Sequence, residues 1–596
     1  MPVNRRDLDF YLYELLQAES LCQRPLYAEH SRESFDAILD TAERVAEDKF
    51  ANHCAKSDAN EPQLVDGKVV LIPEIKEAVD AYIDNGFLAA TFSEEHGGLQ
   101  LPFTVSQAVA FFFHAANGPT VGYPFLSTAA ANLLAAHGSQ EQQDRYMRPM
   151  IEGRFFGTMC LSEPQAGSSL SDIRTTATPT GDGRYLLKGS KMWISGGEHE
   201  LGENIVHLVL AKIPGGPPGA KGISLFIVPR YRLDADGNPG ESNHVALAGL
   251  NHKMGYRGTV NTLLNFGENG DCYGELVGEE HQGLAGMFHM MNEARIAVGF
   301  NAAVQGCSAY QYSLQYARER PQGRSFTNRD ATQPQLKIVE HPDVKRMLLT
   351  QKAYAEGAAA LCLYGARLVD ERASSDDADE RQALLLELEI LTPIIKAWSS
   401  HFCLEANYWA LQILGGYGYT RDYPIEQIYR DNRLNPIHEG TNGIQSFDLL
   451  GRKVTMQGGA AFKLLMGRLL ETATAAEQEE SLADHARALK AAVQTVSETT
   501  VTLGKVAAGG DTDRFLCNSW VYMEMLGHTV IAWSWLKQAL VAATRLGEGS
   551  ADEDFYQAKL NACQFFYRWE LPKVQRQSEL LCSLDDTLLT VTSQAL

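Results

Sequence analysis

The sequence contains no paired-cysteine motif, no long apolar run and no surplus of basic residues. Its ten cysteines are scattered without CxxC spacing, which argues against a disulfide framework and against a zinc site. No apolar stretch approaches the length of a membrane-spanning helix. We therefore expect reduced, mostly buried thiols, no metal site and no transmembrane segment.

Basic residues are outnumbered by acidic ones. The chain has 52 basic against 74 acidic side chains, a formal net charge of -22. This balance argues against sequence-independent binding to nucleic acid or to an anionic membrane, although a local basic patch for a phosphorylated ligand is compatible with it. Residues 1–9 lack the apolar core of a signal peptide, and their acids disfavour a mitochondrial transit peptide. We expect a cytoplasmic protein.

At 596 residues the chain is too long for a single hydrophobic core. Its first part has helical periodicity: Ile75, Val79 and Ile83 share one helical face, with Pro73 at the start and Gly86 at the stop. This pattern predicts a helical array over the first 155 residues.

The pattern changes near residue 156, where short β-forming segments alternate with turn residues. The expected strands are 158–161, 185–188, 191–194, 205–210, 223–228 and 259–266. Helical periodicity returns at about residue 283, and a Gly-Gly pair at 458–459 predicts a linker. The expected fold is α+β and multidomain: an N-terminal helical domain (1–155), a β-barrel or sandwich domain (156–282), a helical bundle (283–457) and an extra C-terminal helical domain (460–596).

A lone carboxylate stands beside a glycine at Glu439 and Gly440, in a run otherwise poor in acids. Low polarity around a carboxylate raises its pKa and its basicity, so this residue type suits removal of a weakly acidic proton from carbon. Gly440 lets the backbone approach a ligand closely. An isolated Glu-Gly pair is more often an ordinary loop, so the functional interpretation depends on other motifs.

Three further motifs precede it in order, and each is weak alone. They are Cys160-Leu161-Ser162-Glu163-Pro164-Gln165-Ala166-Gly167-Ser168, Lys191-Met192-Trp193-Ile194-Ser195 and Gln412-Ile413-Leu414-Gly415-Gly416-Tyr417-Gly418. Together with residues 436–445, in this order and within a helix–β–helix layout, they resemble the acyl-CoA dehydrogenase family over residues 30 to 455. The extra C-terminal domain resembles the large, four-domain bacterial members of that family.

The resemblance implies an FAD cofactor and assigns its contacts motif by motif. Ser162 would lie near the flavin pyrimidine edge, Ser195 would bond at flavin N5, and Trp193 would pack on the ring. Arg320 would reach the FAD pyrophosphate of a neighbouring subunit, which implies a homodimer, and its planar charged group suits a diphosphate. The full set of expected cofactor residues is Leu161, Ser162, Ser168, Trp193, Ile194, Ser195, Arg320, His341, Gln412, Gly416, Thr441 and Gln445.

The same resemblance makes Glu439 the catalytic base, which takes the α-proton of an acyl thioester while the β-hydrogen leaves as hydride. Some relatives carry the base immediately before the arginine that matches Arg295, where this chain has Ala294. Glu293 is adjacent, but a one-residue step on a helix points about 100° away. The expected substrate-binding residues are Ser168, Asn292, Arg295 and Gly440.

The match departs from the family pattern after Arg320. Many relatives place an aromatic residue near the adenine three positions later, whereas this chain continues with Pro321, Gln322 and Gly323. The adenine contact must therefore be made differently.

The resemblance implies dehydrogenation of a medium or long saturated acyl-CoA in β-oxidation, with electrons passed to an electron-transfer flavoprotein. The alternatives are a dehydrogenase of a short thioether-containing acyl-CoA and an acyl-CoA oxidase. A flavoprotein of the alkylation-response type, which binds DNA, fits the acidic balance poorly.

Overall fold

The computed structural model describes residues 3–289, 291–327 and 330–596. The chain forms two compact units, each built from separate stretches of sequence. Of the described residues, the first contains His30–Pro102 and Phe112–Ala294; the second contains residues 3–29, together with Phe103–Phe111 and Arg295–Leu596. Among the described residues, no helix is long and apolar enough to cross a membrane.

Helices open the first unit, as the periodicity predicts. Helix α2 spans Arg32–Val45 and begins with a capping box, in which the Ser34 N–H donates to Ser31 Oγ at 3.2 Å. Helix α4 spans Pro73–Asp84 and ends before an Asn-Gly pair, at the expected place. The remaining helices of this unit are α3 (Cys54–Ala59), α6 (Gln140–Gln142), α7 (Arg148–Ile151) and α8 (Gly283–His289), and α5 (Phe103–His137) and α9 (Met291–Glu319) have residues in both units.

An aromatic cluster packs α4 and α5 together within the first unit. The Phe113 ring lies 4.9 Å from Phe50, 4.8 Å from Tyr82 and 5.2 Å from Phe87, centroid to centroid, and each pair is edge to face. Aromatic rings favour this geometry because the ring edge is positive and the ring face negative.

A short hairpin interrupts the helical array and was not predicted. Strands β1 (Gln63–Val65) and β2 (Lys68–Val70) pair around Asp66 and Gly67, whose φ values are 50° and 78°. An Asp-Gly pair readily adopts two left-handed residues, which is the geometry of a tight hairpin turn. The sequence did not indicate this hairpin within the helical domain, because each of its strands has only three residues.

The β domain contains ten strands, and eight of them form one sheet in the order β10-β11-β5-β12-β7-β6-β3, with β4 paired to both β5 and β6. The path from β5 through β12, β7, β6 and β4 therefore returns to β5, which closes a small barrel. The bounds are β3 (Phe155–Cys160), β4 (Thr176–Pro179), β5 (Tyr185–Ser195), β6 (Asn204–Lys212), β7 (Ile223–Pro229), β8 (Tyr231–Leu233), β9 (Pro239–Ser242), β10 (Val245–Leu250), β11 (Asn261–Phe266) and β12 (Tyr273–Val277).

Strand β6 shows why the domain needs both a barrel core and a helical cover. Every residue of β6 except Lys212 is buried. Val206 and Leu208 pack with side chains of α5 and α7, whereas Val209 and Ala211 point into the barrel core. Because side chains alternate along a strand, both faces of β6 must be covered by apolar groups.

The second unit is helical. Helices α10 (Pro342–Ser374) and α11 (Ala378–Leu414) pack along each other, and α11 also contacts α12 (Ile425–Asn432) and α13 (Asn442–Asp448). The predicted break at residues 458–459 lies near the start of α14 (Met456–Ala476), where Gln457, Gly458 and Gly459 all have left-handed backbone.

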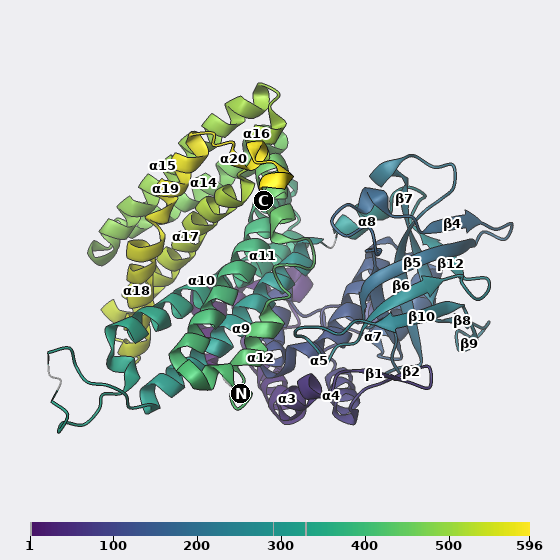
Figure 1. Cartoon of the computed structure of the whole chain (residues 1–596), viewed down its shortest axis with the longest axis horizontal. Coiled ribbons are helices and arrows are strands. Elements are labelled where there is room, and N and C mark those ends of the chain that lie inside the picture. The colour runs from purple at the N-terminus through teal and green to yellow at the C-terminus, as the bar shows by residue number, and fades with distance from the viewer. Residues whose placement is uncertain (1–2, 290, 328–329) are drawn as a thin grey trace. The chain divides into compact units, whose positions relative to one another are not determined.

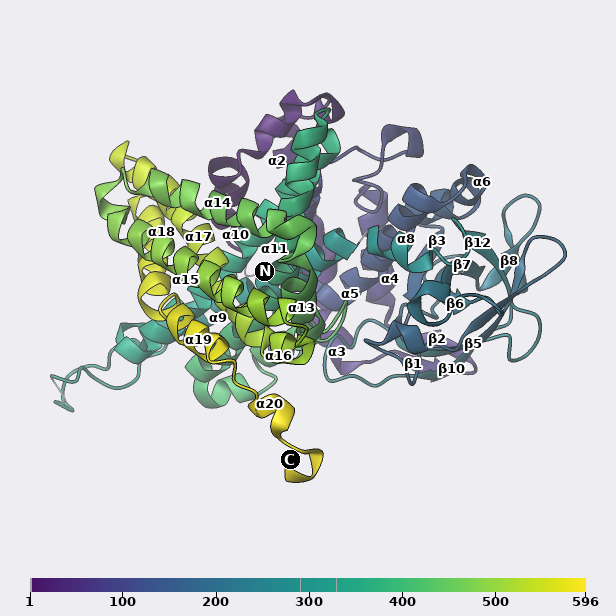
Figure 2. The same ribbon diagram turned by 90° about the horizontal axis from the view of Figure 1, so that it is seen from above.

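The C-terminal helices lie side by side in Figure 1, coloured from green to yellow, and Figure 2 shows them from above. Helix α17 contacts α14, α15, α18 and α19, so it is the centre of this layer. The bounds are α15 (Ala483–Ala508), α16 (Thr512–Leu516), α17 (Ser519–Gly547), α18 (Glu553–Phe565), α19 (Lys573–Cys582) and α20 (Thr587–Thr590).

A buried ion network fastens the first helix of the chain, α1 (Arg5–Asp9), to this layer. Lys559 on α18 is fully buried, and its Nζ lies 2.7 Å from Asp7 Oδ1 and 2.8 Å from Glu356 Oε2 on α10. Lys352, one turn away on α10, lies 2.5 Å from Glu356 Oε1. Two buried carboxylates are thus neutralised by two ammonium groups from separate parts of the sequence.

We expect Lys559→Met to lower the free energy of unfolding of the second unit by about 3–5 kcal/mol, because removal of one partner leaves buried charge uncompensated. Urea unfolding measured by circular dichroism gives the change. Arg487→Ala breaks an exposed pair with Asp484 and should cost less than about 1 kcal/mol. Equal losses in the two variants would show that the buried network contributes no more than a surface pair.

Candidate functional site

The segment between α12 and α13 forms a strained turn at the proposed base. Glu439 has φ of 52° and Gly440 has φ of 82°, so two successive residues are left-handed. For a non-glycine residue this conformation costs energy and is kept where the surroundings hold it, commonly at functional sites. Thr441 ends the turn as the N-cap of α13, and its Oγ1 accepts from the Ile444 N–H at 3.4 Å.

Two side chains hold the carbonyl groups of this turn. Gln445 Nε2 donates to the Glu439 carbonyl at 3.1 Å, and Lys396 Nζ donates to the Gly440 carbonyl at 2.7 Å. The buried Gln445 Oε1 has no hydrogen-bond partner among the described residues. An unpaired buried acceptor is costly, so it marks a place where a bound molecule would be stabilising.

The Glu439 side chain is accessible to solvent, yet the surrounding protein removes enough water to raise the pKa of its carboxyl group. The positive charges of Lys396 and Arg295 oppose that rise. The neighbouring His438 has its pKa lowered to about 3, because burial and the charge of Lys396 disfavour the imidazolium. At neutral pH the base candidate therefore stands next to an uncharged imidazole.

Arg295 on α9 is held beside the turn by α13. Its Nη1 lies 3.0 Å from Asp448 Oδ2, and the arginine side chain is buried. Asn292 lies one turn earlier on the same helix and is half-buried. The Arg295 guanidinium thus forms an ion pair with Asp448 and also acts electrostatically on Glu439.

A cavity of about 480 Å³ lies at the C-terminal end of α11. The Arg320 guanidinium lies 5.9 Å from the centre of the Tyr417 ring and makes no hydrogen bond or ion pair with any described residue. Gly415, with φ of 60°, ends α11, and space is open where a Cβ would stand at Gly415 and Gly416. The lining residues are Tyr316, Arg320, Gln322, Ile338, Ile413, Leu414, Gly415, Gly416, Tyr417 and Thr420.

Two further predicted residues lie near this cavity without lining it. His341 Nε2 is 2.7 Å from the carbonyl of Gln322, so His341 supports a residue of the lining. Gln412 is exposed at the end of α11. The cavity as a whole offers a free guanidinium, tyrosine faces and glycine backbone, which suit a phosphorylated aromatic ligand.

In the first unit, the turn after β3 is locked by a buried ion pair. Lys191 Nζ lies 2.9 Å from Glu163 Oε1 and 3.0 Å from the Leu161 carbonyl. Burial alone would raise the pKa of Glu163, but the Lys191 charge and hydrogen bonds from Thr175 and Arg174 lower it to about 2. Leu161 and Ser162 are therefore fixed against strand β5.

Strand β5 presents the second motif beside that turn. The Met192 N–H donates to the Ser162 carbonyl at 3.0 Å, and Asn261 Nδ2 donates to Ser195 Oγ at 3.0 Å. Trp193 has φ of 65° and is 60% exposed, which is unusual for so large an apolar side chain. The Ile194 side chain lies in the barrel core, so only its backbone is available to a ligand.

The structure thus gathers the predicted residues in three places. Leu161, Ser162, Trp193, Ile194 and Ser195 adjoin one another in the first unit, and Ser168 is exposed on the same loop as Ser162. In the second unit Glu439, Gly440, Thr441 and Gln445 form the base turn, with Arg295 held next to it by Asp448. Arg320 and Gly416 line the cavity.

Sequence reasoning missed Lys396 and Tyr417. Lys396 had a visible signal, a lone charge inside the apolar run Ile394-Ile395-Lys396-Ala397-Trp398. Tyr417 belongs to the motif at residues 412–418 but was not predicted as a site residue. Its position opposite Arg320 depends on how the chain folds after α11.

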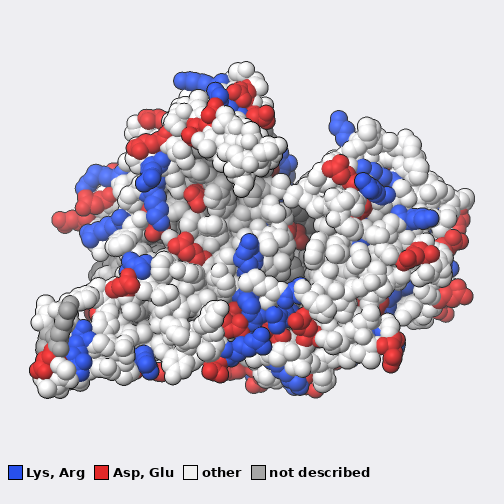
Figure 3. All heavy atoms as spheres, in the orientation of Figure 1, with Lys and Arg blue, Asp and Glu red and all other residues white. Residues whose placement is uncertain are grey.

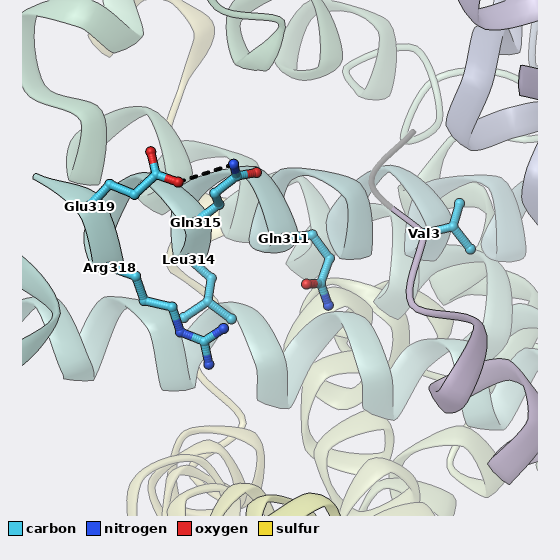
Figure 4. A pocket seen from close by; sticks show the side chains of 6 residues that line it. All are labelled: Val3, Gln311, Leu314, Gln315, Arg318 and Glu319. Atoms are coloured by element: carbon cyan, nitrogen blue, oxygen red, sulfur yellow. Dashed lines mark hydrogen bonds between the residues drawn. The ribbon is translucent and has the colours of Figure 1, made fainter.

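Another cavity, of about 240 Å³, lies along α9 beside Val3 and is shown in Figure 4. It is lined by Gln311, Leu314, Gln315, Arg318 and Glu319, and the Gln315 amide donates to Glu319 at 3.2 Å. None of its lining residues is a predicted site residue, although Arg318 and Glu319 directly precede Arg320. Among the described residues, no group of three His, Cys, Asp or Glu side chains is placed to hold a metal ion.

We expect Gly440→Ala to destabilise the second unit by about 1–3 kcal/mol, because φ is left-handed there and strained positions cost energy of this order. The new Cβ would also lie 2.6 Å from Gln445 Nε2 and displace the amide that holds Glu439. Urea unfolding followed by tryptophan fluorescence measures the loss. In Gly443→Ala the added methyl meets only Thr441 Oγ1 at 4.0 Å, so this control should be as stable as the parent or slightly more so.

Comparison with protein families covers nearly the whole chain. Four domain models match: Acyl-CoA dehydrogenase, N-terminal domain, at residues 32–154; the middle domain at 158–267; the C-terminal domain at 281–455; and Acetyl-CoA dehydrogenase C-terminal like at 465–592.

Curated relatives match at full length. The chain is 34% identical to the 3-methylmercaptopropionyl-CoA dehydrogenase of Ruegeria pomeroyi, over 98% of this chain and 99% of the relative. It is 32% identical to the broad-specificity linear acyl-CoA dehydrogenase FadE5 of Mycobacterium tuberculosis, over 99% of both chains. A butyryl-CoA dehydrogenase of Syntrophomonas wolfei is 32% identical over 96% of this chain and 95% of its own length.

Solved structures share the fold. The acyl-CoA dehydrogenase of Bacillus anthracis, complexed with FAD, matches with a TM-score of 0.75 at 21% identity, over 95% of this chain and 91% of that chain. The ACDH-11 protein of Caenorhabditis elegans, in complex with C11-CoA, matches with a TM-score of 0.74 at 17% identity, over 99% and 94%. The chain therefore belongs to the acyl-CoA dehydrogenase family, a family of FAD-dependent oxidoreductases that act on CH–CH bonds.

Proposed function

We propose that this protein dehydrogenates a fatty acyl-CoA thioester between its α and β carbons, forming a trans-2-enoyl-CoA, with Glu439 as the catalytic base. The observation that carries the proposal is the left-handed turn that presents Glu439, an accessible carboxylate whose pKa is raised. A base with a raised pKa takes a proton from carbon more readily than an ordinary carboxylate does.

The chain's own groups account for the proton step. Glu439 receives the α-proton of the thioester and becomes a neutral carboxylic acid. Its backbone N–H donates to no described residue, so it is available to the thioester carbonyl oxygen, where negative charge develops. A donor of this kind contributes roughly 3–4 kcal/mol in other enzymes. Bound FAD supplies the oxidising chemistry by accepting the β-hydrogen with its electron pair.

Within each unit, taken by itself, some residues suit parts of FAD. Arg320, whose guanidinium makes no hydrogen bond or ion pair with the described residues, suits a pyrophosphate. Tyr417 and Tyr316 line the same cavity and offer aromatic rings in place of the family's usual aromatic residue. Trp193, exposed beside Ser195, suits a flat aromatic ring. The unpaired Gln445 Oε1 suits a hydrogen-bond donor of the cofactor. Because the family arginine serves a neighbouring subunit, we also propose a homodimer.

The acyl chain length is the finer part of the proposal. We favour medium to long saturated chains, in line with the extra C-terminal helical domain. The alternative is a short thioether-containing acyl-CoA, because the Ruegeria pomeroyi relative, matched over the full chain, carries 3-methylmercaptopropionyl-CoA in its name.

Nucleic acid is not a fitting partner. The formal net charge is -22, and on the face shown in Figure 3 the basic side chains are interspersed with acidic ones. Binding to a polyphosphate backbone requires clustered positive charge. This opposes the DNA-binding alternative.

We expect the purified yellow protein to bleach during anaerobic titration with an acyl-CoA, and Glu439→Gln to slow this reduction by roughly 10²–10⁴-fold, as loss of a general base does. Butyryl-, octanoyl-, palmitoyl- and 3-(methylthio)propanoyl-CoA, compared in parallel, identify the chain class. Glu293→Gln serves as the control and should reduce at the parental rate. Reduction of the Glu439→Gln variant at that same rate would refute the base assignment.

We expect the reduced protein to pass electrons to an electron-transfer flavoprotein much faster than to oxygen. Stopped-flow absorbance measures the rate of flavin reoxidation by oxygen and, separately, by the oxidised electron-transfer flavoprotein. A peroxide assay follows the reaction with oxygen. Rapid, stoichiometric peroxide formation would instead identify an acyl-CoA oxidase.

A further inference from the structure

Lys396 is a buried cation placed beneath the base turn. It lies in the middle of α11 and has no exposed surface. Within the described ranges no carboxylate forms an ion pair with it; its Nζ donates to two neutral oxygens, the Gly440 carbonyl at 2.7 Å and Asn442 Oδ1 at 3.1 Å. A buried charge without a paired carboxylate is costly, so its retention calls for a specific reason.

The same oxygens connect α11 to the start of α13. Ser400 Oγ donates to Asn442 Oδ1 at 3.1 Å, and Asn442 Nδ2 donates back to the Ala397 carbonyl at 3.2 Å. Lys396 therefore holds the turn at Gly440, and Asn442, the first residue of α13, is held by Lys396, Ser400 and the Ala397 carbonyl. Both carbonyl groups of the left-handed turn are therefore bonded: that of Glu439 by Gln445 and that of Gly440 by Lys396.

The charged groups around Lys396 couple its protonation to that of the base. Burial lowers the pKa of the Lys396 ammonium to about 7; the carboxylate of Glu439 opposes this shift and the guanidinium of Arg295 adds to it. His438, on the same turn as Glu439, is held neutral in part by Lys396. Two further charged pairs lie in this region. Arg295 pairs with Asp448 on α13, and Lys453 pairs with Glu389.

We propose that Lys396 is a positioning residue for Glu439: it fixes the left-handed turn through the Gly440 carbonyl, and its charge keeps the carboxylate ionised. The inference rests on the proposed role of Glu439 as base. Lys396 donates a hydrogen bond to the turn and has no contact with the reacting carbon. It therefore influences the reaction only through the position and ionisation of Glu439.

The sign of the effect follows from the charges. A nearby ammonium stabilises the carboxylate and lowers its pKa, and the base is active only while it is ionised. Removal of the charge must raise the pKa of Glu439. The acid limb of kcat/KM, which reports ionisation of the base in the free enzyme, must then move to higher pH.

The test uses the flavin-loaded enzyme and three variants. In Lys396→Met we expect the acid limb of kcat/KM to rise by roughly 1 pH unit, an ordinary size for loss of a neighbouring opposite charge. Lys396→Gln keeps a donor for the Gly440 carbonyl but loses the charge, so its limb should rise similarly. Ser400→Ala removes a neutral hydrogen bond to the same Asn442 oxygen and should leave the limb in place.

An infrared titration measures the protonation of the Glu439 carboxyl group directly, without catalytic turnover. The C=O band that disappears in Glu439→Gln reports its protonation, and the midpoint of that band should rise in Lys396→Met and Lys396→Gln. An unchanged midpoint in a folded, flavin-containing neutral variant would overturn the proposal, as would an equal shift in Ser400→Ala. If the parent protein oxidises no acyl-CoA, the proposed function fails, while the infrared midpoint still decides the role of Lys396.

Discussion

The left-handed turn of Glu439 and Gly440 is the constraint on which the proposed chemistry depends. With Glu439 and Gly440 at positive φ, the carboxylate side chain is accessible, and the backbone N–H of Glu439 donates to none of the residues that the structure describes. The conformation is unfavourable for a glutamate on its own and persists because Gln445 and Lys396 each hold one carbonyl. The bonds from Lys396, Ser400 and Ala397 on α11 to Gly440 and Asn442 therefore bear on the position of one carboxyl group.

The fold class was predictable because periodicity differs between its parts. The α+β multidomain fold with helical, β, helical and extra helical parts is confirmed, as is the family that the ordered motifs indicated. Segments 185–188 and 191–194 proved to be one strand, β5, which passes through Gly189 without ending. Strands β4, β8, β9, β10 and β12 were missed because they are short or partly exposed and lack clear alternation. The predicted domain boundaries stay predictions.

The site was predictable where its chemistry lies within a continuous segment. Glu439, Gly440 and Gln445 are neighbours in sequence, and the structure brings them into one turn. Lys396 was not predictable in this role, because it lies 43 positions before Glu439 and only packing brings its Nζ to the Gly440 carbonyl. The individual roles of the predicted contact residues remain predictions, whereas the enzyme class and the flavin cofactor follow from the family.

The ion network around Lys559 has a consequence for how the chain is made. Asp7 leaves the ribosome long before Lys559, its partner, has been synthesised. Contacts between residues so distant in sequence form slowly, because a large loop must be closed before they stabilise anything. The first helix must therefore wait, and Phe10, which directly follows it, lacks its ring contact with Phe555 until α18 has emerged. The β domain, whose strands lie within about a fifth of the sequence, is free of that delay, and so the two units should acquire their structure at different times during synthesis.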